Sequence, residues 1–97
     1  MDEQQTRSAV QAHADAVVRG DFDHVTEDFI EEMRPQVPQI GQSLPRPVTA
    51  AQVRSLEIGA EECVAEIHYE GENGAVTIRS RWRDVDGRPQ IFAGEPL

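Results

Sequence analysis

The chain has 97 residues, enough for one folded domain with a single modest core. Its 18 acidic residues outnumber nine basic ones, all of them arginine, and the net charge is −9. Because phosphate binding needs a basic surface, this charge argues against nucleic acid and anionic membranes as the main partners.

The cysteine content and the N-terminal residues indicate a cytoplasmic location. Cys63 is the single cysteine, which excludes an internal disulfide and fits a reducing compartment. The stretch from Met1 to Gln5 is acidic and polar with no apolar run behind it, so no signal peptide is expected. No later stretch is apolar and long enough to cross a bilayer, so no membrane partner is expected either.

Residues from about 4 to 33 predict two amphipathic helices. In the first, which runs to about Arg19, apolar positions recur at the spacing of one helical stripe. Gly20 ends this helix, and Asp21 or Asp23 is placed to cap the next one. The stripe consists of Val10, His13, Ala14, Val17 and Val18.

The second helix is expected from Phe22 to about Met33, with an apolar side toward the core. Its other side carries four acids, which we interpret as a solvated face rather than a metal or partner site. The apolar residues are Phe22, Val25, Phe29 and Met33, and the acids are Glu27, Asp28, Glu31 and Glu32.

Residues 34–47 contain four prolines and predict an irregular connection. Proline at this density argues against a helix and against a central strand, although a short turn fits residues 40–44. The length of the segment is consistent with a crossing over the open end of the core or with a flexible lid.

Residues from about 49 to 93 predict a sheet of four strands. The expected strands cover residues 53–58, 63–70, 75–85 and 89–93. Gly59-Ala60, Asn73-Gly74 and Asp86-Gly87 supply three short turns, and successive short turns make an antiparallel meander.

The turns leave the register of the second and third strands open but assign the faces. A two-residue Asn73-Gly74 turn sets Glu66 opposite Arg81, whereas a four-residue turn sets Glu66 opposite Arg79. Around Asp86-Gly87, Trp82 is expected opposite Ile91 and Arg81 opposite Phe92. The two registers differ by an even number of residues, so both keep each side chain on the same face.

One face of the sheet is apolar and the other is charged. The apolar face suits burial beneath the two helices, and it is expected to contain Leu56, Ile58, Cys63, Ala65, Ile67, Tyr69, Val76, Ile78, Ser80, Trp82 and Ile91. The charged face is expected to contain Glu62, Glu66, His68, Glu70, Arg79, Arg81 and Arg83, with Val53, Val64 and Phe92 among them. We interpret its arginine row as paired with the acids of the second strand rather than as an anion site.

The pattern as a whole resembles the nuclear-transport-factor-2-like superfamily, which has a curved, cystatin-like sheet. The resemblance lies in two N-terminal helices joined by Gly20-Asp21-Phe22-Asp23, and in a tryptophan strand that turns at Asp86-Gly87. It implies an α+β fold, with two helices packed on a curved four-stranded antiparallel meander, as a truncated cone over residues 1–97. The family's third helix and early strands are replaced here by residues 34–47.

The resemblance also implies a ligand site between the helices and the concave sheet face. The pocket candidates are His13, Tyr69, Ser80 and Trp82, where a histidine on an apolar stripe can orient a carbonyl or transfer a proton. His13, Tyr69 and Trp82 also have a purely structural interpretation as core residues with a satisfied polar edge. The ketosteroid-isomerase residue set does not transfer, because the first helix has no tyrosine and no acid falls on a clearly buried position.

Other chemistry finds no support in the sequence. His13, His24 and His68 lie far apart without ligand spacing, so no metal and no cofactor are expected. Cys63 falls on an inward strand position and is interpreted as a packed thiol.

Two functions follow from these features. The first is a non-catalytic homodimer that associates through the outer sheet face, because a two-fold axis can pair a field of acids and arginines with itself. Its dimer-face candidates are Val53, Val64, Glu66, His68, Arg79, Arg81, Arg83 and Phe92. The alternative is a small-molecule binding protein, or an isomerase- or cyclase-like enzyme, that acts on an apolar carbonyl compound in the helix–sheet pocket.

Overall fold

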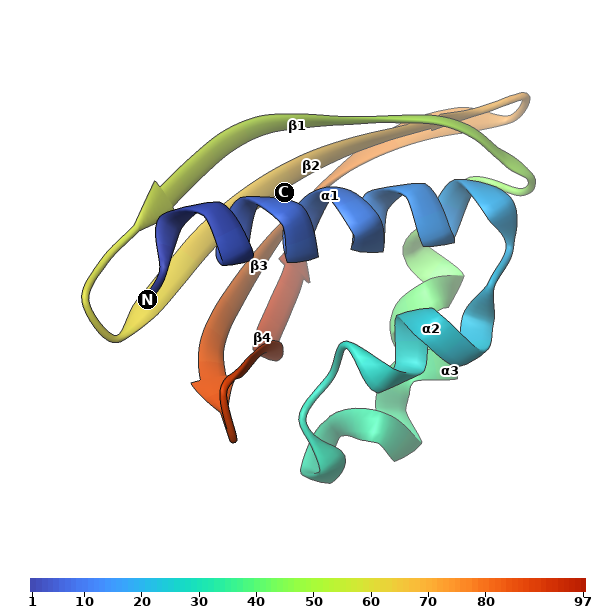
Figure 1. Cartoon of the computed structure of the whole chain (residues 1–97). Helices are drawn as coiled ribbons and strands as arrows, with labels where there is room; N and C mark the ends of the chain where they lie inside the picture. Colours follow the sequence, from blue (N-terminus) through green and yellow to red (C-terminus); the bar gives the residue numbers. More distant parts are fainter.

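The computed structural model describes residues 1–97 and shows helices on the concave side of a curved sheet (Figure 1). Helix α1 (Glu3–Arg19) lies along the sheet, and the short helices α2 (Phe22–Glu27) and α3 (Val37–Ile40) lie at one end of the concave side. The sheet has four antiparallel strands in the order β1-β2-β3-β4. This is the α+β meander that the sequence predicts.

Helix α1 confirms the first predicted helix, although Val18, expected on its buried stripe, is exposed. Asp2 caps its N-terminus by accepting a hydrogen bond from the backbone N–H of Gln5, and Gly20 ends it in the left-handed conformation with φ 73°. Its inner side is buried and consists of Thr6, Val10, His13, Ala14, Ala16 and Val17. Burial of this stripe against the sheet holds the helix in place.

The second predicted helix is wrong in length and in two of its burial assignments. Helix α2 starts at an Asp21 cap but ends at Glu27, and the chain then runs alongside β4 (Arg88–Pro96). The backbone N–H of Ile91 donates to the Asp28 carbonyl at 2.7 Å, and that of Ile30 donates to the Ile91 carbonyl at 2.9 Å. These bonds to the sheet replace the helical ones.

The early end of α2 reverses two burial assignments. Phe22, expected in the core, has 64% of its surface exposed. Asp28, expected on a solvated face, is only 3% exposed. Val25 and Phe29 are buried as expected.

The proline-rich segment is helical up to Ser43, so the prediction of an irregular connection is wrong except for residues 44–47. It forms the 3-10 helices η1 (Glu31–Gln36) and η2 (Gly41–Ser43) on either side of α3. Proline is compatible with α3 because Pro38 lies in its first turn, where no backbone N–H is needed. Pro35 lies inside η1. The predicted turn at residues 40–44 corresponds to η2.

The strands are longer than predicted and choose one of the two registers. They are β1 (Val48–Ile58), β2 (Glu62–Gly71), β3 (Gly74–Val85) and β4. Glu66 lies opposite Arg79 across β2 and β3, which is the second of the two expected registers. At the last turn Asp86 and Gly87 have φ values of 53° and 81°, the signature of a tight hairpin, and Trp82 lies opposite Ile91 as predicted.

Two bulges change the predicted faces locally. The register of β1 shifts between Val53 and Ser55, so Val53 lies opposite Ile67 and packs against the core. Its assignment to the outer face is therefore wrong, because an extra residue inverts the alternation. A second shift in β4 sets Arg81 opposite Ala93 instead of Phe92.

The buried core joins α1 to the concave face of the sheet. Its largest fully buried side chains include Trp82, Ile67, Ile91 and Val10. The predicted inner face is confirmed, with Cys63, Ala65, Tyr69 and Ser80 buried and with Leu56, Ile58, Val76 and Ile78 partly buried against them.

Candidate functional site

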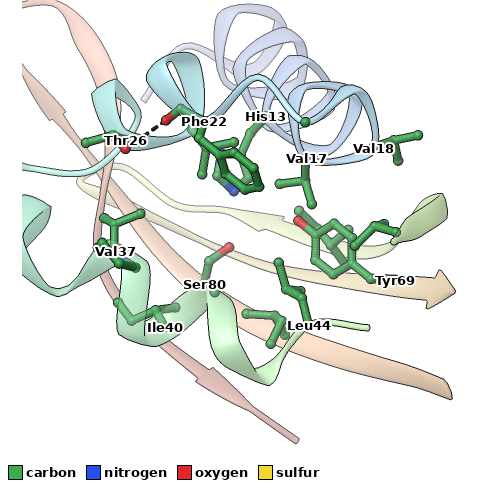
Figure 2. Close-up of a pocket in the computed structure, with 18 of the residues that line it drawn as sticks. His13, Val17, Val18, Phe22, Thr26, Val37, Ile40, Leu44, Tyr69 and Ser80 are labelled. Carbon is green, nitrogen blue, oxygen red and sulfur yellow. Dashed lines mark hydrogen bonds between the residues drawn. The ribbon is translucent and has the colours of Figure 1, made fainter. Parts of the chain in front are cut away.

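A cavity of about 660 Å³ lies between the helices and the concave face of the sheet. Sites for drug-sized ligands have volumes of about 300–1,000 Å³. Figure 2 shows its walls, with α1 and α2 on one side, the α3–η2 segment on another, and β2 and β3 behind. Most of the side chains are apolar, among them Val17, Val25, Phe29, Val37, Ile40, Leu44, Ile67 and Ile78.

His13 lies in this wall and is 6% exposed. Its ring is held by edge contacts with Trp82 and Phe29, at centroid distances of 5.5 and 6.1 Å. Its Nδ1 lies 2.8 Å from Oδ2 of Asp28, in a buried pair. These contacts determine the orientation of the imidazole.

Asp28 supports His13 from outside the cavity wall. Arg88, at the start of β4, donates from Nη2 to Asp28 Oδ1 at 2.9 Å, and Nε2 of His24 lies 3.5 Å from Oδ2. The backbone of Asp28 is also bonded to Ile91. The carboxylate therefore has a partner for each oxygen, as a buried charge requires.

Sequence reasoning missed both Asp28 and Arg88. Asp28 comes three residues after Val25, so on a helix it flanks the apolar stripe, and this position is the one local signal that could have singled it out. Arg88 had no such signal, because only the β3–β4 turn brings it to the end of α2.

The hydrogen-bond pattern leaves one ring nitrogen of His13 available. With Asp28 accepting from Nδ1, the proton of a neutral imidazole lies on Nδ1 and the lone pair on Nε2. Nε2 has no hydrogen-bond partner within the protein. Every fully buried side-chain nitrogen or oxygen does have such a partner, so Nε2 is not fully buried. Nε2 is therefore accessible to a ligand rather than sealed in the core.

Tyr69 and Ser80 also line the cavity (Figure 2). The Tyr69 hydroxyl has no partner within the protein, and burial raises the pKa of Tyr69, with a further contribution from the Asp28 charge. Tyr69 therefore stays protonated and can donate a hydrogen bond. The Ser80 hydroxyl is already engaged, since it accepts from Trp82 Nε1 at 2.9 Å and contacts the Ala65 carbonyl at 3.5 Å.

Trp82 does not line the cavity, which corrects its assignment as a pocket candidate. It is completely buried and lies behind His13 and Ser80. Trp82 contacts the ring of His13 and donates a hydrogen bond to the hydroxyl of Ser80, and it thereby orients both groups.

Most of the dimer-face candidates lie together on the opposite face of the sheet. Arg79 is bonded to Glu66 at 3.0 Å, and Arg81 is bonded to Glu62. Arg81 and Arg83 both lie over the ring of Phe92, at 5.7 and 5.3 Å. His68 bonds to Thr77 at 2.9 Å, and Val64 lines a second hollow of about 340 Å³ with Glu66, Arg79 and Arg81.

The arrangement offers no set of metal ligands. No three histidine, cysteine or carboxylate side chains gather in a way that could hold a metal ion. No helix is both long enough and apolar enough to span a membrane.

The fold is that of nuclear-transport-factor-2-like proteins. A solved structure of such a protein of unknown function, from Burkholderia xenovorans, superimposes with a TM-score of 0.71 at 16% identity over 97% of this chain and 84% of that one. A SEC-C motif containing protein from Rhodopseudomonas palustris superimposes with a TM-score of 0.68 at 18% identity over 92% of this chain and 76% of that one. No protein-family model matches the sequence, and no curated protein matches it significantly.

Proposed function

We propose that this protein binds an apolar, carbonyl-bearing small molecule in the helix–sheet cavity and that His13 transfers a proton to or from it. The observation that carries the proposal is the buried His13–Asp28 pair, whose free Nε2 belongs to the wall of an apolar cavity. A histidine held in one tautomer by a carboxylate is suited to general base catalysis.

The chemistry that fits these residues is proton transfer next to a carbonyl group. Nε2 of His13 would remove a proton from the carbon beside the carbonyl, and the electron pair would move onto the carbonyl oxygen to give an enolate. The Tyr69 hydroxyl would donate a hydrogen bond to that oxygen. Return of the proton to the same carbon gives exchange, and its return to another carbon gives isomerisation.

The proposal is tested with a simple apolar ketone, 2-decanone, in deuterated buffer. Binding is measured from shifts in the amide spectrum of the labelled protein, and exchange from loss of the ketone's α-proton signals. We expect His13→Gln to retain binding and to slow exchange by about 100-fold or more, since general base catalysis contributes about that factor.

His68→Gln is the matched control, because His68 lies on the opposite face of the sheet. It should leave both binding and exchange unchanged. The proposal would be contradicted if 2-decanone shifted the amide signals of residues outside the cavity lining. It would also be contradicted if His13→Gln exchanged the ketone's α-protons at the wild-type rate.

As a second proposal, two copies of the chain associate through the outer face of the sheet. The supporting observation is the second hollow on this face, where Glu57, Glu66 and Glu95 lie with Arg79 and Arg81 in a field of both charges. Such a field can be complementary to itself about a two-fold axis. Light scattering at micromolar concentration should give the mass of a dimer, and Arg81→Glu should convert it to monomer while Arg7→Glu on α1 does not.

We also propose a cytoplasmic location. The supporting observation is that Cys63 is buried and free, as expected in a reducing compartment. Cell fractionation with an antibody against the chain tests this, and recovery in a membrane or extracellular fraction would contradict it.

A further inference from the structure

The charge of the cavity lining differs from that of the rest of the chain. Eighteen of the 97 residues are acidic, yet none of the 24 residues that line the cavity is an aspartate or glutamate. The lining includes two arginines, Arg19 and Arg46, both of them exposed and therefore at the edge of the cavity. An acidic protein thus has a cavity whose lining includes arginine but no carboxylate.

The two arginines are not equivalent. Arg19 ends α1 and donates to Asp21 at 3.3 Å, and Asp21 in turn caps α2. The pKa of Asp21 is lowered by the backbone N–H of His24 and by Arg19, so this pair is already engaged in the fold. Arg46, in contrast, has no carboxylate partner.

Only the backbone of Arg46 is bonded, through its N–H to Oδ1 of Asn73 at 3.0 Å. Pro45 and Pro47 on either side of it also line the cavity, and both pack against Gly71 of β2. The position of Arg46 at the rim is therefore held by its neighbours while its guanidinium stays free.

The interior and the rim of the cavity thus suit different parts of a ligand. The interior presents apolar side chains with His13 Nε2 and the Tyr69 hydroxyl among them. The rim presents a free guanidinium, which prefers a carboxylate or a phosphate. Val18 and Phe22, which are exposed apolar residues, also line the cavity.

We propose that the ligand is an amphipathic anion, with an apolar body inside the cavity and a carboxylate or phosphate end group at the rim, bound by Arg46. This inference rests on the proposed function and narrows its ligand class. The net charge of −9 repels anions in general, so an anionic ligand of this protein needs such a local cation.

The experiment compares three ligands with the same ten-carbon chain: decanoate, decyl phosphate and 1-decanol. Affinities are measured by calorimetry at low salt. We expect both anions to bind at least about threefold more tightly than the alcohol, as is typical of an exposed charge pair. Arg46→Gln should remove this preference while leaving the affinity for 1-decanol unchanged.

Arg54→Gln is the matched control, because Arg54 also lacks a carboxylate partner but lies on β1 outside the cavity lining. It should leave all three affinities unchanged. Preference for decyl phosphate over decanoate would identify the end group as a phosphate, and the reverse would identify a carboxylate.

Two outcomes separate this inference from the proposed function. If 1-decanol and 2-decanone bind and the anions bind no better, or if Arg46→Gln and Arg54→Gln have the same effect, the inference is wrong and the proposed function stands. If none of the four compounds binds, the proposed function is wrong and the inference with it.

Discussion

Nδ1 of His13 lies 2.8 Å from the carboxylate of Asp28, which follows it by 15 residues in the chain. Both side chains are almost completely buried, and Arg88 contacts the same carboxylate from the start of β4. Three separate segments, α1, the end of α2 and the start of β4, therefore meet at one carboxylate. The pair thus has a structural role besides its place in the proposed chemistry.

The first prediction concerns the charge of Asp28. Asp28→Asn keeps the shape of the side chain but leaves Arg88 without its ionic partner, so it should lower the free energy of unfolding by about 2–4 kcal/mol. Urea unfolding followed by circular dichroism measures the change. Glu27→Gln removes the same charge from the exposed neighbour and should have an effect within about 0.5 kcal/mol. Equal effects of the two variants would show that the charge of Asp28 contributes no more to stability than an exposed charge.

The second prediction concerns the bond that orients Trp82. Ser80→Ala removes the acceptor of the buried Trp82 Nε1–H and should cost about 1–3 kcal/mol, because an unsatisfied buried donor loses its solvation without compensation. Tryptophan fluorescence should also change, since the indole loses its polar neighbour. Ser8→Ala, on the exposed side of α1, should change neither quantity, and no loss of stability in Ser80→Ala would contradict the assigned bond.

The third prediction concerns stability at alkaline pH. Burial raises the pKa of Cys63 from its ordinary value of 9.0 to about 11, so the neutral thiol is favoured in the folded state. The contribution of the neutral thiol to the free energy of unfolding is fully present below pH 9 and is lost as the pH rises from 9 to 11. Stability should therefore fall by roughly 2 kcal/mol over this range from Cys63 alone.

Tyr69 adds to this alkaline loss of stability, because its pKa is also raised from an ordinary value of 10.0. The midpoints of urea unfolding at pH 8, 9.5 and 11 measure this loss of stability. Cys63→Ala should reduce the dependence on pH in this range without abolishing it. An unchanged dependence in Cys63→Ala would show that the thiol is not desolvated in the folded protein.

The fourth prediction concerns the contact between the proline-rich segment and the sheet. A Cβ at Gly71 would lie 2.6 Å from Cβ of Pro45 and would also collide with the carbonyl oxygen of Pro47. Gly71→Ala should therefore cost about 1–3 kcal/mol and increase hydrogen exchange in residues 37–48, since overpacking displaces the backbone.

Gly41→Ala is the control for this contact. A Cβ at Gly41 meets no atom within 4 Å, and its backbone is helical, so alanine should stabilise slightly or have no effect. If Gly71→Ala leaves exchange in the segment unchanged, the segment is not held by this contact.

The strand periodicity was sufficient to predict the sheet, because alternation is a local property. The inward position of Cys63, Ile67 and Trp82 follows from the period of two and from the turns, and the structure confirms it. Val53 shows where this reasoning ends. A bulge adds one residue to β1 and inverts the faces on either side, and nothing in the residue pattern marks its position.

The helical segments show the same limit more clearly. The stripe of α1 and its Gly20 end are local signals, and both are correct except for Val18, which is exposed. The end of α2 is not local, because bonds from Ile91 of β4 to the backbone of Asp28 and Ile30 draw the chain out of the helix. Phe22 is left exposed and Asp28 is buried as a consequence.

The sequence by itself determined the α+β class, the order of the elements and which side of the sheet faces the helices, and it singled out His13 and Tyr69 as candidates. Only the tertiary structure decided that a cavity exists beside them, that Asp28 and Arg88 complete the site and that Trp82 lies behind it. The reason is physical. Periodicity reports the neighbours of a residue along the chain, whereas burial of a charge and the volume of a cavity depend on segments that meet only after the chain has folded.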